Sequence, residues 1–493
     1  MIALNGNSML NRLHFTPVVC AAIGAAAGFY FLFYAHIAVI IAVLSILLAS
    51  FCFFHVLCSL YAQYRIFLQA AICAAALVSG LFLGICAAYA GSNEVNFAVP
   101  EKNIIGIEGV LLEDPRIISG GRAIVSLSMR KCAASGGMRV SSSGEITVFF
   151  PQWSAEKLRE FGRGTVVFAE GRLRSSDTGC TYSAESLHIV KPASAVERMR
   201  TNVRLNLIGR FDGKPWGGLA LALLLGIKDN LDANLASLYR DAGLSYILAL
   251  SGMHLAVLAA LIAFLLKKPL GLKASAAVGA VIIILYCFLV GPMPSLNRAA
   301  LMYLLGVAAI FGALPKKPMS ILCLSFLIQI VITPAAGNSI SFILSYLALA
   351  GILIIGQPLY SLFCGKVPDF LSQPLSASCG AFIATAGVSC FAFGTIAPIG
   401  IIAGLVLVPL ITIFMIGSMI WLALDFLSIS TIFSFPLSLL YRLMEKIVSA
   451  AGGISGISAS PSLILALSIV LSLVIAALEY RRGSQALRLQ PFL

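Results

Sequence analysis

The chain has 493 residues, of which 60% are hydrophobic and only 11% are charged, and its mean hydropathy is +0.99. A soluble domain carries roughly 25% charged residues, so this chain has too few charges to cover a water-facing surface. The composition excludes a soluble globular protein and indicates an integral membrane protein. The net charge of +13 does not by itself indicate nucleic-acid binding, because cytoplasmic loops of membrane proteins are rich in Lys and Arg.

Apolar segments of about 20 residues, the length that spans a bilayer, lie on both sides of one polar segment. They predict a polytopic α-helical membrane protein of about twelve spans. The first run has no small-residue cleavage site, so it is expected to remain as an anchor. The expected spans are 17–34, 35–57, 66–89, 245–266, 274–290, 296–314, 320–333, 340–362, 377–393, 396–424, 433–451 and 463–479.

The polar segment at 91–192 alternates in short runs broken by Gly-Gly and Ser-Gly turns, with a helical turn expected at 154–161. This pattern predicts a small β-barrel, closed or nearly closed, inserted between membrane helices. Its five expected strands are 104–110, 122–127, 145–150, 165–173 and 183–190.

After Pro192 the pattern becomes helical and amphipathic, which is typical of a helix lying at a bilayer surface. The apolar run at 218–227 is too short to span, and 228–243 is amphipathic again, so 193–243 is expected to be interfacial or re-entrant. Apolar positions recur every three or four residues against arginines: Val196, Met199, Val203, Leu207 and Phe211 against Arg198, Arg200, Arg204 and Arg210.

Basic residues in short loops predict the orientation, because they favour the cytoplasmic side. All of them agree with a β-domain outside the cytoplasmic (inner) membrane and both termini in the cytoplasm. The expected parts are anchor helices (1–90), the β-domain (91–192), interfacial helices (193–243), the main bundle (244–480) and a cytoplasmic tail (481–493). The basic residues are Arg65, Lys267, Lys268, Lys273, Lys316, Lys317, Lys366, Arg481 and Arg482.

Ten of the twelve cysteines lie in apolar segments, where Cys behaves as a small hydrophobe, and only Cys132 and Cys180 lie in the polar domain. The space outside the membrane is oxidising, so a Cys132–Cys180 disulfide is expected, with two unrelated thiols as the alternative. The chain has no CxxC pair and no His/Cys cluster, so neither a metal site nor a cofactor is expected.

Ionisable residues inside a membrane are costly and are functional candidates for that reason. Here His254 and Arg298 lie in two short polar groups, at 251–254 and 295–298, which are expected to line a polar path in the outer half of the membrane. The alternative is structural, with a close helix contact at Gly252 and an interhelical hydrogen bond from His254. A Ser–His pair without a carboxylate is a weak hydrolase signal, so no catalytic residue is expected. The candidates are Ser251, Gly252, His254, Ser295, Asn297 and Arg298.

The segments 222–226 and 242–254, ending in Ser251-Gly252-Met253-His254, resemble the core motif of the ComEC competence family. Residues 291–302 resemble its Ser-x-x-Arg-Ala-x-x-Met element, and 339–348 and 404–410 resemble two further stretches, with Gly404 in place of an Asn. Tyr246 stands where the family often has His. The resemblance covers nearly the whole chain.

The resemblance implies a channel, not an enzyme, through which one DNA strand crosses the cytoplasmic membrane during natural transformation, with an OB fold as the outer domain. It implies single-stranded DNA, membrane lipid, a DNA receptor and a DNA-translocating ATPase as partners. Many members carry a metallo-β-lactamase-like domain, but this chain has no His-x-His-x-Asp-His, so a separate nuclease is expected if that activity is needed. Candidate DNA contacts are Arg172, Arg174, Arg200 and Arg204.

Two other functions stay open at the level of sequence. A secondary transporter or exporter of a small or lipid-like solute would show inverted repeats with helices broken at matching places, and no convincing repeat is found. A membrane enzyme of envelope glycans would carry several Arg and His residues in its outer loops, whereas this bundle offers mainly Arg298.

Overall fold

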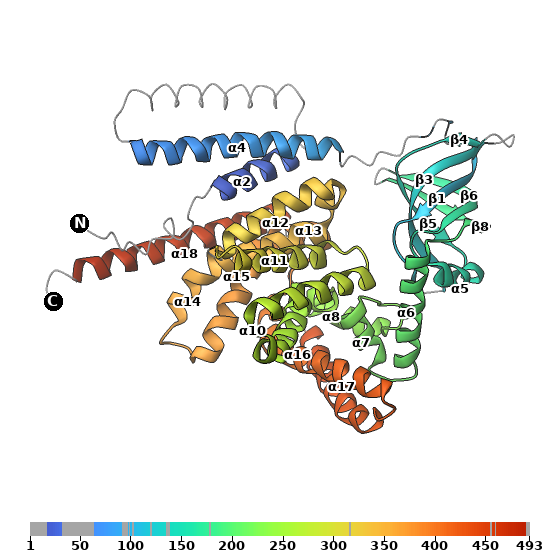
Figure 1. The fold of residues 1–493 in the computed structure, drawn as a ribbon. Coiled ribbons are helices and arrows are strands. Elements are labelled where there is room, and N and C mark those ends of the chain that lie inside the picture. The colour runs from blue at the N-terminus through green and yellow to red at the C-terminus, as the bar shows by residue number, and fades with distance from the viewer. Residues whose placement is uncertain are drawn as a thin grey trace.

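The computed structural model describes residues 17–31, 64–90, 97, 99–100, 103–118, 121–134, 139–176, 179–314, 317–453, 456–458 and 460–489. Figure 1 shows a β-domain at one end of the molecule and a helical bundle at the other, with helix α6 (Ala195–Phe211) between them. The predicted span at 35–57 lies outside the described residues. The architecture agrees with the predicted combination of membrane helices and an inserted β-domain.

The β-domain is a closed barrel. Its wall follows the order β1-β3-β5-β7-β6, and β6 pairs with β1 to close it. Alternate side chains of β3 are buried inside it, because successive residues of a strand point to opposite faces. Helix α5 (Gln152–Phe161) follows β5. The strands are β1 (Ile104–Leu111), β2 (Arg116–Ile117), β3 (Ala123–Ala134), β4 (Arg139–Ser141), β5 (Glu145–Phe150), β6 (Val166–Ser176), β7 (Gly179–Ala184) and β8 (His188–Lys191).

The last predicted strand, 183–190, is two strands in the structure. The chain leaves β7 after Ala184, and the backbone N–H groups of Glu185 and Ser186 both donate to the carbonyl oxygen of Glu170, at 2.7 and 3.1 Å. After this turn β8 pairs with the start of β6 and lies outside the closed wall. The prediction of a closed barrel is confirmed, and its final strand boundary was wrong.

No disulfide joins Cys132 and Cys180 in the structure, contrary to the expectation from sequence. Cys132 is buried on β3 and Cys180 is partly buried on β7, and β5 lies between these strands in the sheet. Neighbouring strands are about 4.8 Å apart, whereas a disulfide requires Cα atoms within about 7 Å. Two strands separated by a third are too far apart for a bond across the sheet.

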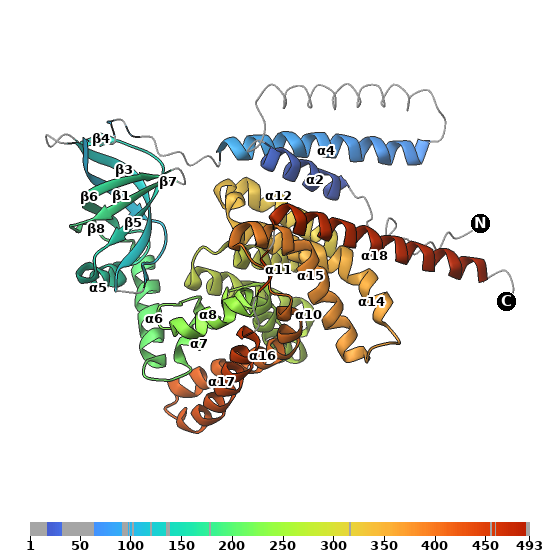
Figure 2. The same cartoon turned by 180° about the vertical axis from the view of Figure 1, so that it is seen from behind.

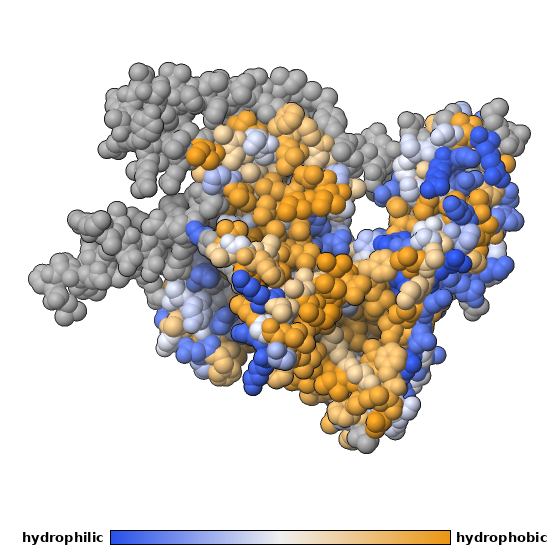
Figure 3. Space-filling view, in the orientation of Figure 1, coloured by the Kyte–Doolittle hydropathy of each residue, from blue (hydrophilic) through white to orange (hydrophobic). Residues whose placement is uncertain are grey.

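The bundle is built from helices that are mostly apolar along their length. Large side chains face outward from it, such as Phe264, 80% exposed, and Phe391, 77% exposed, and Figure 3 shows a broad hydrophobic surface over these helices. The helices are α2 (Pro17–Phe31), α4 (Tyr64–Ala90), α7 (Gly217–Leu225), α8 (Ala233–Asp241), α9 (Ser245–Leu248), α10 (Gly252–Val290), α11 (Pro294–Phe311), α12 (Pro318–Ile332), η2 (Pro334–Asn338), α13 (Ile340–Gly351), η3 (Ile352–Gly356), α14 (Gln357–Phe363), α15 (Asp369–Phe393), α16 (Ile399–Phe426), α17 (Thr431–Gly452) and α18 (Pro461–Leu489).

In the described part of the chain, five helices are long and apolar enough to cross a membrane, and four shorter apolar helices accompany them. An exposed apolar surface of this extent requires lipid, so the chain is an integral membrane protein. The five are Gly252–Val290, Pro294–Phe311, Ile340–Phe363, Asp369–Phe393 and Ile399–Phe426, and the shorter ones are Pro17–Tyr30, Ile72–Ala88, Pro318–Ile332 and Pro461–Ile475.

Three predicted spans differ in form from the structure. The pair expected at 245–266 and 274–290 belongs mainly to α10, which is interrupted at Gly271, with φ 75°, close to Pro269. The span expected at 433–451 corresponds to α17, which carries three charged residues, Arg442, Glu445 and Lys446, and is not among the five candidate spans. The total of about twelve spans therefore stays a prediction.

The short helix α7 is enclosed by protein rather than by lipid. Eight of its nine residues are buried, and Trp216 at its start packs against Trp421 of α16, with ring centroids 5.1 Å apart. A helix that is apolar on all sides must be buried on all sides. The structure thus agrees with the prediction that 218–227 does not span the membrane.

Four glycines let α2 and α4 pack in backbone contact. A Cβ atom at Gly24 or Gly28 would overlap the carbonyl oxygen of Leu77 or Leu81, and one at Gly84 would overlap that of Ala25. The contacts advance in the same direction along both helices, so the helices run parallel. Small residues at such spacings allow close approach of membrane helices, which gives the Gly-x-x-x-Gly pairs of this sequence a structural role.

We expect the substitution Gly84→Leu to separate α2 from α4, because its side chain would occupy the space of the Ala25 carbonyl group. Cys20 and Cys73 hydrogen bond across this helix pair, so oxidative cross-linking between them reports on the packing. Cross-linking of the variant, measured by peptide mass mapping, should fall on the order of tenfold, in proportion to the packing lost at a close helix contact. Gly306→Leu is the control, since nothing lies within 4 Å of a Cβ atom there. Equal cross-linking in both variants would contradict the assignment.

Candidate functional site

The site begins where the chain enters α10. Helix α9 ends at Leu248, and Ser251 is the N-cap of α10, with its Oγ accepting from the backbone N–H of Met253 at 3.3 Å. The backbone N–H of Ser251 donates to Nδ1 of His254 at 3.0 Å, and the Ser251 Oγ lies 3.1 Å from the same nitrogen. This reciprocal cap satisfies polar groups that a helix start leaves open.

The cap changes the position expected for Ser251 and His254. The sequence pattern placed them two to three turns inside a helix, whereas the structure places them at its first turn, after a break in the helix. His254 is 1% exposed, and its Nε2 has no hydrogen-bond partner among the described residues. Because Nδ1 accepts a hydrogen bond, the neutral ring carries its proton on Nε2 and presents a buried donor.

The start of α11 packs against this break. Ser295 donates its hydroxyl to the carbonyl oxygen of Leu250 at 2.7 Å. A Cβ atom at Gly252 would lie 3.2 Å from Nη2 of Arg298, so a larger residue there would push the guanidinium group away from the helix start. Asn297 lies one residue before Arg298 in α11 and is half-buried. The six predicted residues therefore occupy two adjacent helix starts.

Arg298 is buried in the bundle, with 8% of the residue exposed. Its Nη1 donates to the carbonyl oxygen of Ser345 in α13 at 2.7 Å, and its guanidinium carbon lies 5.7 Å from the ring centroid of Tyr346. Its Nε has no hydrogen-bond partner among the described residues, and no carboxylate there forms an ion pair with it. Among the described residues, a carbonyl group and a ring are the partners of this positive charge.

Three residues that the sequence reading missed extend the site. The Tyr346 hydroxyl donates to Oε1 of Gln329 at 3.0 Å and lies 3.3 Å from the Ser325 hydroxyl, and Nε2 of Gln329 donates to the Pro294 carbonyl oxygen at 3.2 Å. The available signal was a glutamine in the apolar helix α12, since buried amides usually join neighbouring membrane helices.

The arrangement favours a negatively charged group. The N-terminal ends of α10 and α11 carry partial positive charge from the aligned dipoles of their peptide groups, and both lie beside Arg298. Helices broken inside a membrane bind anions in this way. The site therefore has donors and positive potential in the middle of an apolar bundle.

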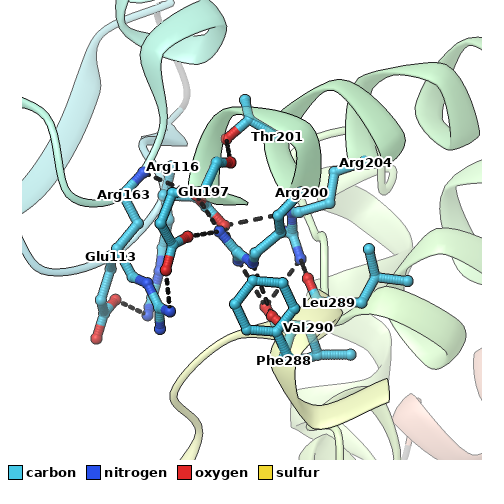
Figure 4. A network of polar contacts seen from close by, with 11 residues as sticks. Glu113, Arg116, Arg163, Glu197, Arg200, Thr201, Arg204, Phe288, Leu289 and Val290 are labelled. Atoms are coloured by element: carbon cyan, nitrogen blue, oxygen red, sulfur yellow. Dashed lines mark hydrogen bonds and ion pairs between the residues drawn. The ribbon is translucent and has the colours of Figure 1, made fainter. Parts of the chain in front are cut away.

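A second polar cluster joins the β-domain to the bundle (Figure 4). The Arg200 side chain has no exposed surface. Its guanidinium donates to both carboxylate oxygens of Asp114, at 3.0 and 2.6 Å, and to Glu197 at 3.4 Å. It also donates to the carbonyl oxygens of Phe288 at 2.7 Å and Val290 at 3.4 Å, in the last turn of α10. One side chain thus binds the barrel, α6 and α10.

Neighbouring residues complete this junction. Arg204 donates to the carbonyl oxygens of Leu289 at 3.0 Å and Val290 at 2.8 Å, and its Nε lies 3.2 Å from Asp114. Arg163 of the barrel pairs with Glu197 of α6 at 2.5 Å. Cations at a helix C-terminus are stabilised by its negative end, so the two arginines cap α10 while they hold Asp114.

The junction corrects the expectation that Arg200 and Arg204 contact DNA. Their side chains are 0% and 11% exposed, and their donors are used by a carboxylate and by helix carbonyl groups. Arg172 and Arg174 differ, because both lie on the outer face of β6, and Arg172 is 84% exposed with one pairing to Glu185 at 3.4 Å. The amphipathic pattern predicted the helix but not which of its faces the protein covers.

The junction also sets the ionisation of its acidic member. Burial raises the pKa of Asp114, but the hydrogen bonds from Arg200 and the charges of Arg204 and Arg200 lower it by more, so its pKa lies below the usual value. Burial lowers the pKa of Arg204, and the charge of Asp114 opposes this change. At neutral pH Asp114 is therefore a carboxylate, and it faces the guanidinium groups of Arg200 and Arg204.

Comparison with known proteins identifies the part of the chain that holds the site. Residues 223–482 match the competence protein family, over more than half of the chain and across every residue of the candidate site. This chain belongs to the competence protein family. A protein of Aquifex aeolicus described as uncharacterized is 29% identical over 45% of this chain and 50% of its own length. The ComE operon protein 3 of Bacillus subtilis is 27% identical over 26% of this chain and 17% of its own length.

The chain spans half or less of the length of these two relatives. No solved structure matches it. The family match begins within α7 and ends within α18, so it leaves out the barrel, α2 and α4. The family assignment therefore rests on the bundle.

We expect Arg200→Met to destabilise the protein by about 3–5 kcal/mol, the usual cost of removing one partner of a buried ion pair. Thermal unfolding of the purified protein in detergent measures this change. Arg172→Met is the control, because an exposed ion pair contributes little. The ion pairs of Asp114 stabilise the folded protein fully above the pKa that its carboxyl group has in the unfolded chain, and this stabilisation is lost as pH falls through the lower folded pKa. Asp114→Asn should therefore remove this part of the pH dependence of the unfolding free energy. If Arg200→Met and Arg172→Met were equally stable, the junction would not contribute to the stability of the fold.

Proposed function

We propose that the chain forms a channel through which single-stranded DNA crosses the cytoplasmic membrane during natural transformation. The membership of the competence protein family supports a role in DNA uptake, and the relative from Bacillus subtilis carries a competence operon name. The observation that carries the channel proposal is Arg298, a buried cation without a carboxylate partner in the described part of the bundle, beside two helix N-termini.

The physical argument concerns the charge on DNA. Each nucleotide brings one phosphate, and a charge in a low-dielectric surrounding is prohibitively costly unless donors or cations meet it. Arg298 would meet a phosphate near the outer face, and the Nε2 donor of His254 and the hydroxyl of Ser251 would follow. Ser295, Gly252 and Asn297 would keep the two helix starts in position beside the DNA strand.

The orientation proposed for this channel has the barrel outside the membrane and both termini in the cytoplasm. In Figures 1 and 2 the C-terminal end of α4 points toward the β-domain, whereas the C-terminal end of α18 lies on the opposite side of the bundle. α6 runs across the direction of these two helices, as an interfacial helix would. About twelve spans remain part of this proposal.

The barrel is proposed to be OB-like and to contact DNA at its rim. Counting only the strands of the closed wall, the order is 1-2-3-5-4, and α5 lies between the third and fourth strands. OB folds bind oligonucleotides with their second and third strands and with the turn between strands four and five. Arg172 and Arg174 lie on the fourth strand, shortly before that turn. A DNA receptor, a cytoplasmic DNA-translocating ATPase and a separate nuclease are the proposed protein partners, and the chain itself is proposed not to be an enzyme.

The first test measures DNA uptake and protein abundance together. We expect Ser251→Ala, His254→Ala and Arg298→Ala to lower uptake on the order of tenfold or more, because a lost charged hydrogen bond costs about 1.5–3 kcal/mol. Arg298→Lys should retain part of the uptake if charge matters more than guanidinium geometry. Arg442→Ala, at an exposed position of α17, is the control. Normal uptake with normal abundance would refute the path, and uptake that falls only as abundance falls would assign these residues to folding.

The second test concerns orientation. Fusions at Ser8 and after Leu493 should be active only with reporters that work in the cytoplasm, because every short basic loop agrees with that placement. A fusion in the β6–β7 turn, next to Ser176, should be active only with a reporter that works outside. An outside signal from either terminus would overturn the proposed topology.

A further inference from the structure

An open groove of about 720 Å³ runs along the outer face of α6. One wall is α5, with Glu160 and Phe161, and the far end is Phe426, the last residue of α16. The floor is α6 itself, through Arg198, Met199, Asn202, Val203, Asn206 and Arg210. Neither the barrel junction nor the buried site in the bundle uses these side chains. Arg210 forms a separate ion pair with Asp425.

The groove has an apolar half that protein does not cover. Met199 is 70% exposed and Val203 is 39% exposed, one helical turn apart, and Val196 continues the stripe at 62%. At the end of the groove Phe426 is 60% exposed, and Leu427 and Ile429 beyond it are 66% and 55% exposed. The apolar half is therefore continuous with the end of a spanning helix, whose surface faces lipid.

The groove also has a polar half, in which one arginine and one glutamate form no ion pair among the described residues. Arg198, Asn202 and Asn206 follow one another at intervals of four, which places them on one face of α6. Arg163, Arg200, Arg204 and Arg210 all bind carboxylates around this helix, whereas Arg198 forms no ion pair within the described residues. Glu160 stands on the opposite wall and likewise forms none there.

We propose that this groove binds one membrane phospholipid whose headgroup carries an amine as well as a phosphate. Arg198, with the amides of Asn202 and Asn206, would bind the phosphate, and Glu160 would bind the amine. Met199, Val203 and Phe426 would contact an acyl chain. A helix with apolar and basic stripes at a bilayer surface has this chemistry.

The charge of the groove favours a lipid over a nucleic acid. A DNA strand brings a phosphate at every nucleotide and is bound by several cations in a row. This groove instead has one arginine, Arg198, without an ion pair among the described residues, and it faces a carboxylate. The exposed methionine and valine would gain nothing from a phosphate backbone. A lipid of no net charge matches both halves, and this proposal does not depend on DNA transport.

The experiment uses the full-length protein purified in detergent and titrated with phosphatidylethanolamine, with native mass spectrometry to count bound lipid. We expect one phosphatidylethanolamine bound tightly, and affinity lower on the order of tenfold in Arg198→Glu, as for a lost charged hydrogen bond. Arg198→Lys should keep most of the affinity. Glu160→Gln should remove the preference for phosphatidylethanolamine over phosphatidylglycerol without removing binding. Arg172→Glu, the same charge change at an exposed barrel position outside the groove, should bind as the unchanged protein does.

Several results would overturn the proposal. Equal binding by Arg198→Glu and Arg172→Glu would place the lipid elsewhere. Displacement of the bound lipid by a short oligonucleotide or by inorganic phosphate would identify the groove as a site for those anions. Unfolding temperatures measured on every variant separate lost binding from lost folding, and Met199→Glu, at an exposed position, tests the acyl contact without changing Arg198.

Discussion

The burial of Arg200 fixes the relation between the two halves of this protein. A fully buried guanidinium group is tolerated only when its donors are used and its charge is balanced, and here Asp114 of the barrel, Glu197 of α6 and two carbonyl groups of α10 meet those demands. Each partner comes from a different part of the chain. The barrel therefore cannot change its position on the bundle without exposing or orphaning one of these charges.

This constraint reaches the candidate site along a short stretch of chain. Arg200 contacts Val290, and a Cβ atom at Gly291 would lie 2.9 Å from its Nη2. Ser295 and Arg298 follow within eight residues of Val290, on the first turns of α11. The connection between α10 and α11 thus begins at Val290, which contacts the junction with the barrel, and leads directly to the buried cation Arg298. A family match that begins after the barrel still includes the surface on which the barrel is seated.

Sequence patterns predicted the helices and strands better than they predicted which groups the side chains of these elements contact. Alternation found the closed barrel because its inner residues must be apolar on every strand. The length of the apolar run at 218–227 showed that it does not span the membrane, but not that α7 is buried in protein. The pattern around Arg200 and Arg204 predicted a helix with a basic face, but a pattern cannot tell whether solvent or a carboxylate 86 residues away meets that face. Ser251 and His254 were read at helical spacing, and the spacing is correct, yet the same spacing is that of a capping box. The Gly-x-x-x-Gly pairs became informative only when both partners of the contact were known.

The two buried arginines show why only one of them suits a passing anion. Arg200 is balanced by Asp114 and lies at the negative end of α10, so a phosphate would have to displace a carboxylate to reach it. Arg298 lies beside the positive ends of two helices, and within the described residues it has a carbonyl oxygen and a ring but no carboxylate. Like charges in an apolar bundle raise the free energy of the empty site. An anion that entered would lower that free energy, and among the described residues no second cation would hold it there, which is the balance that the proposed channel requires.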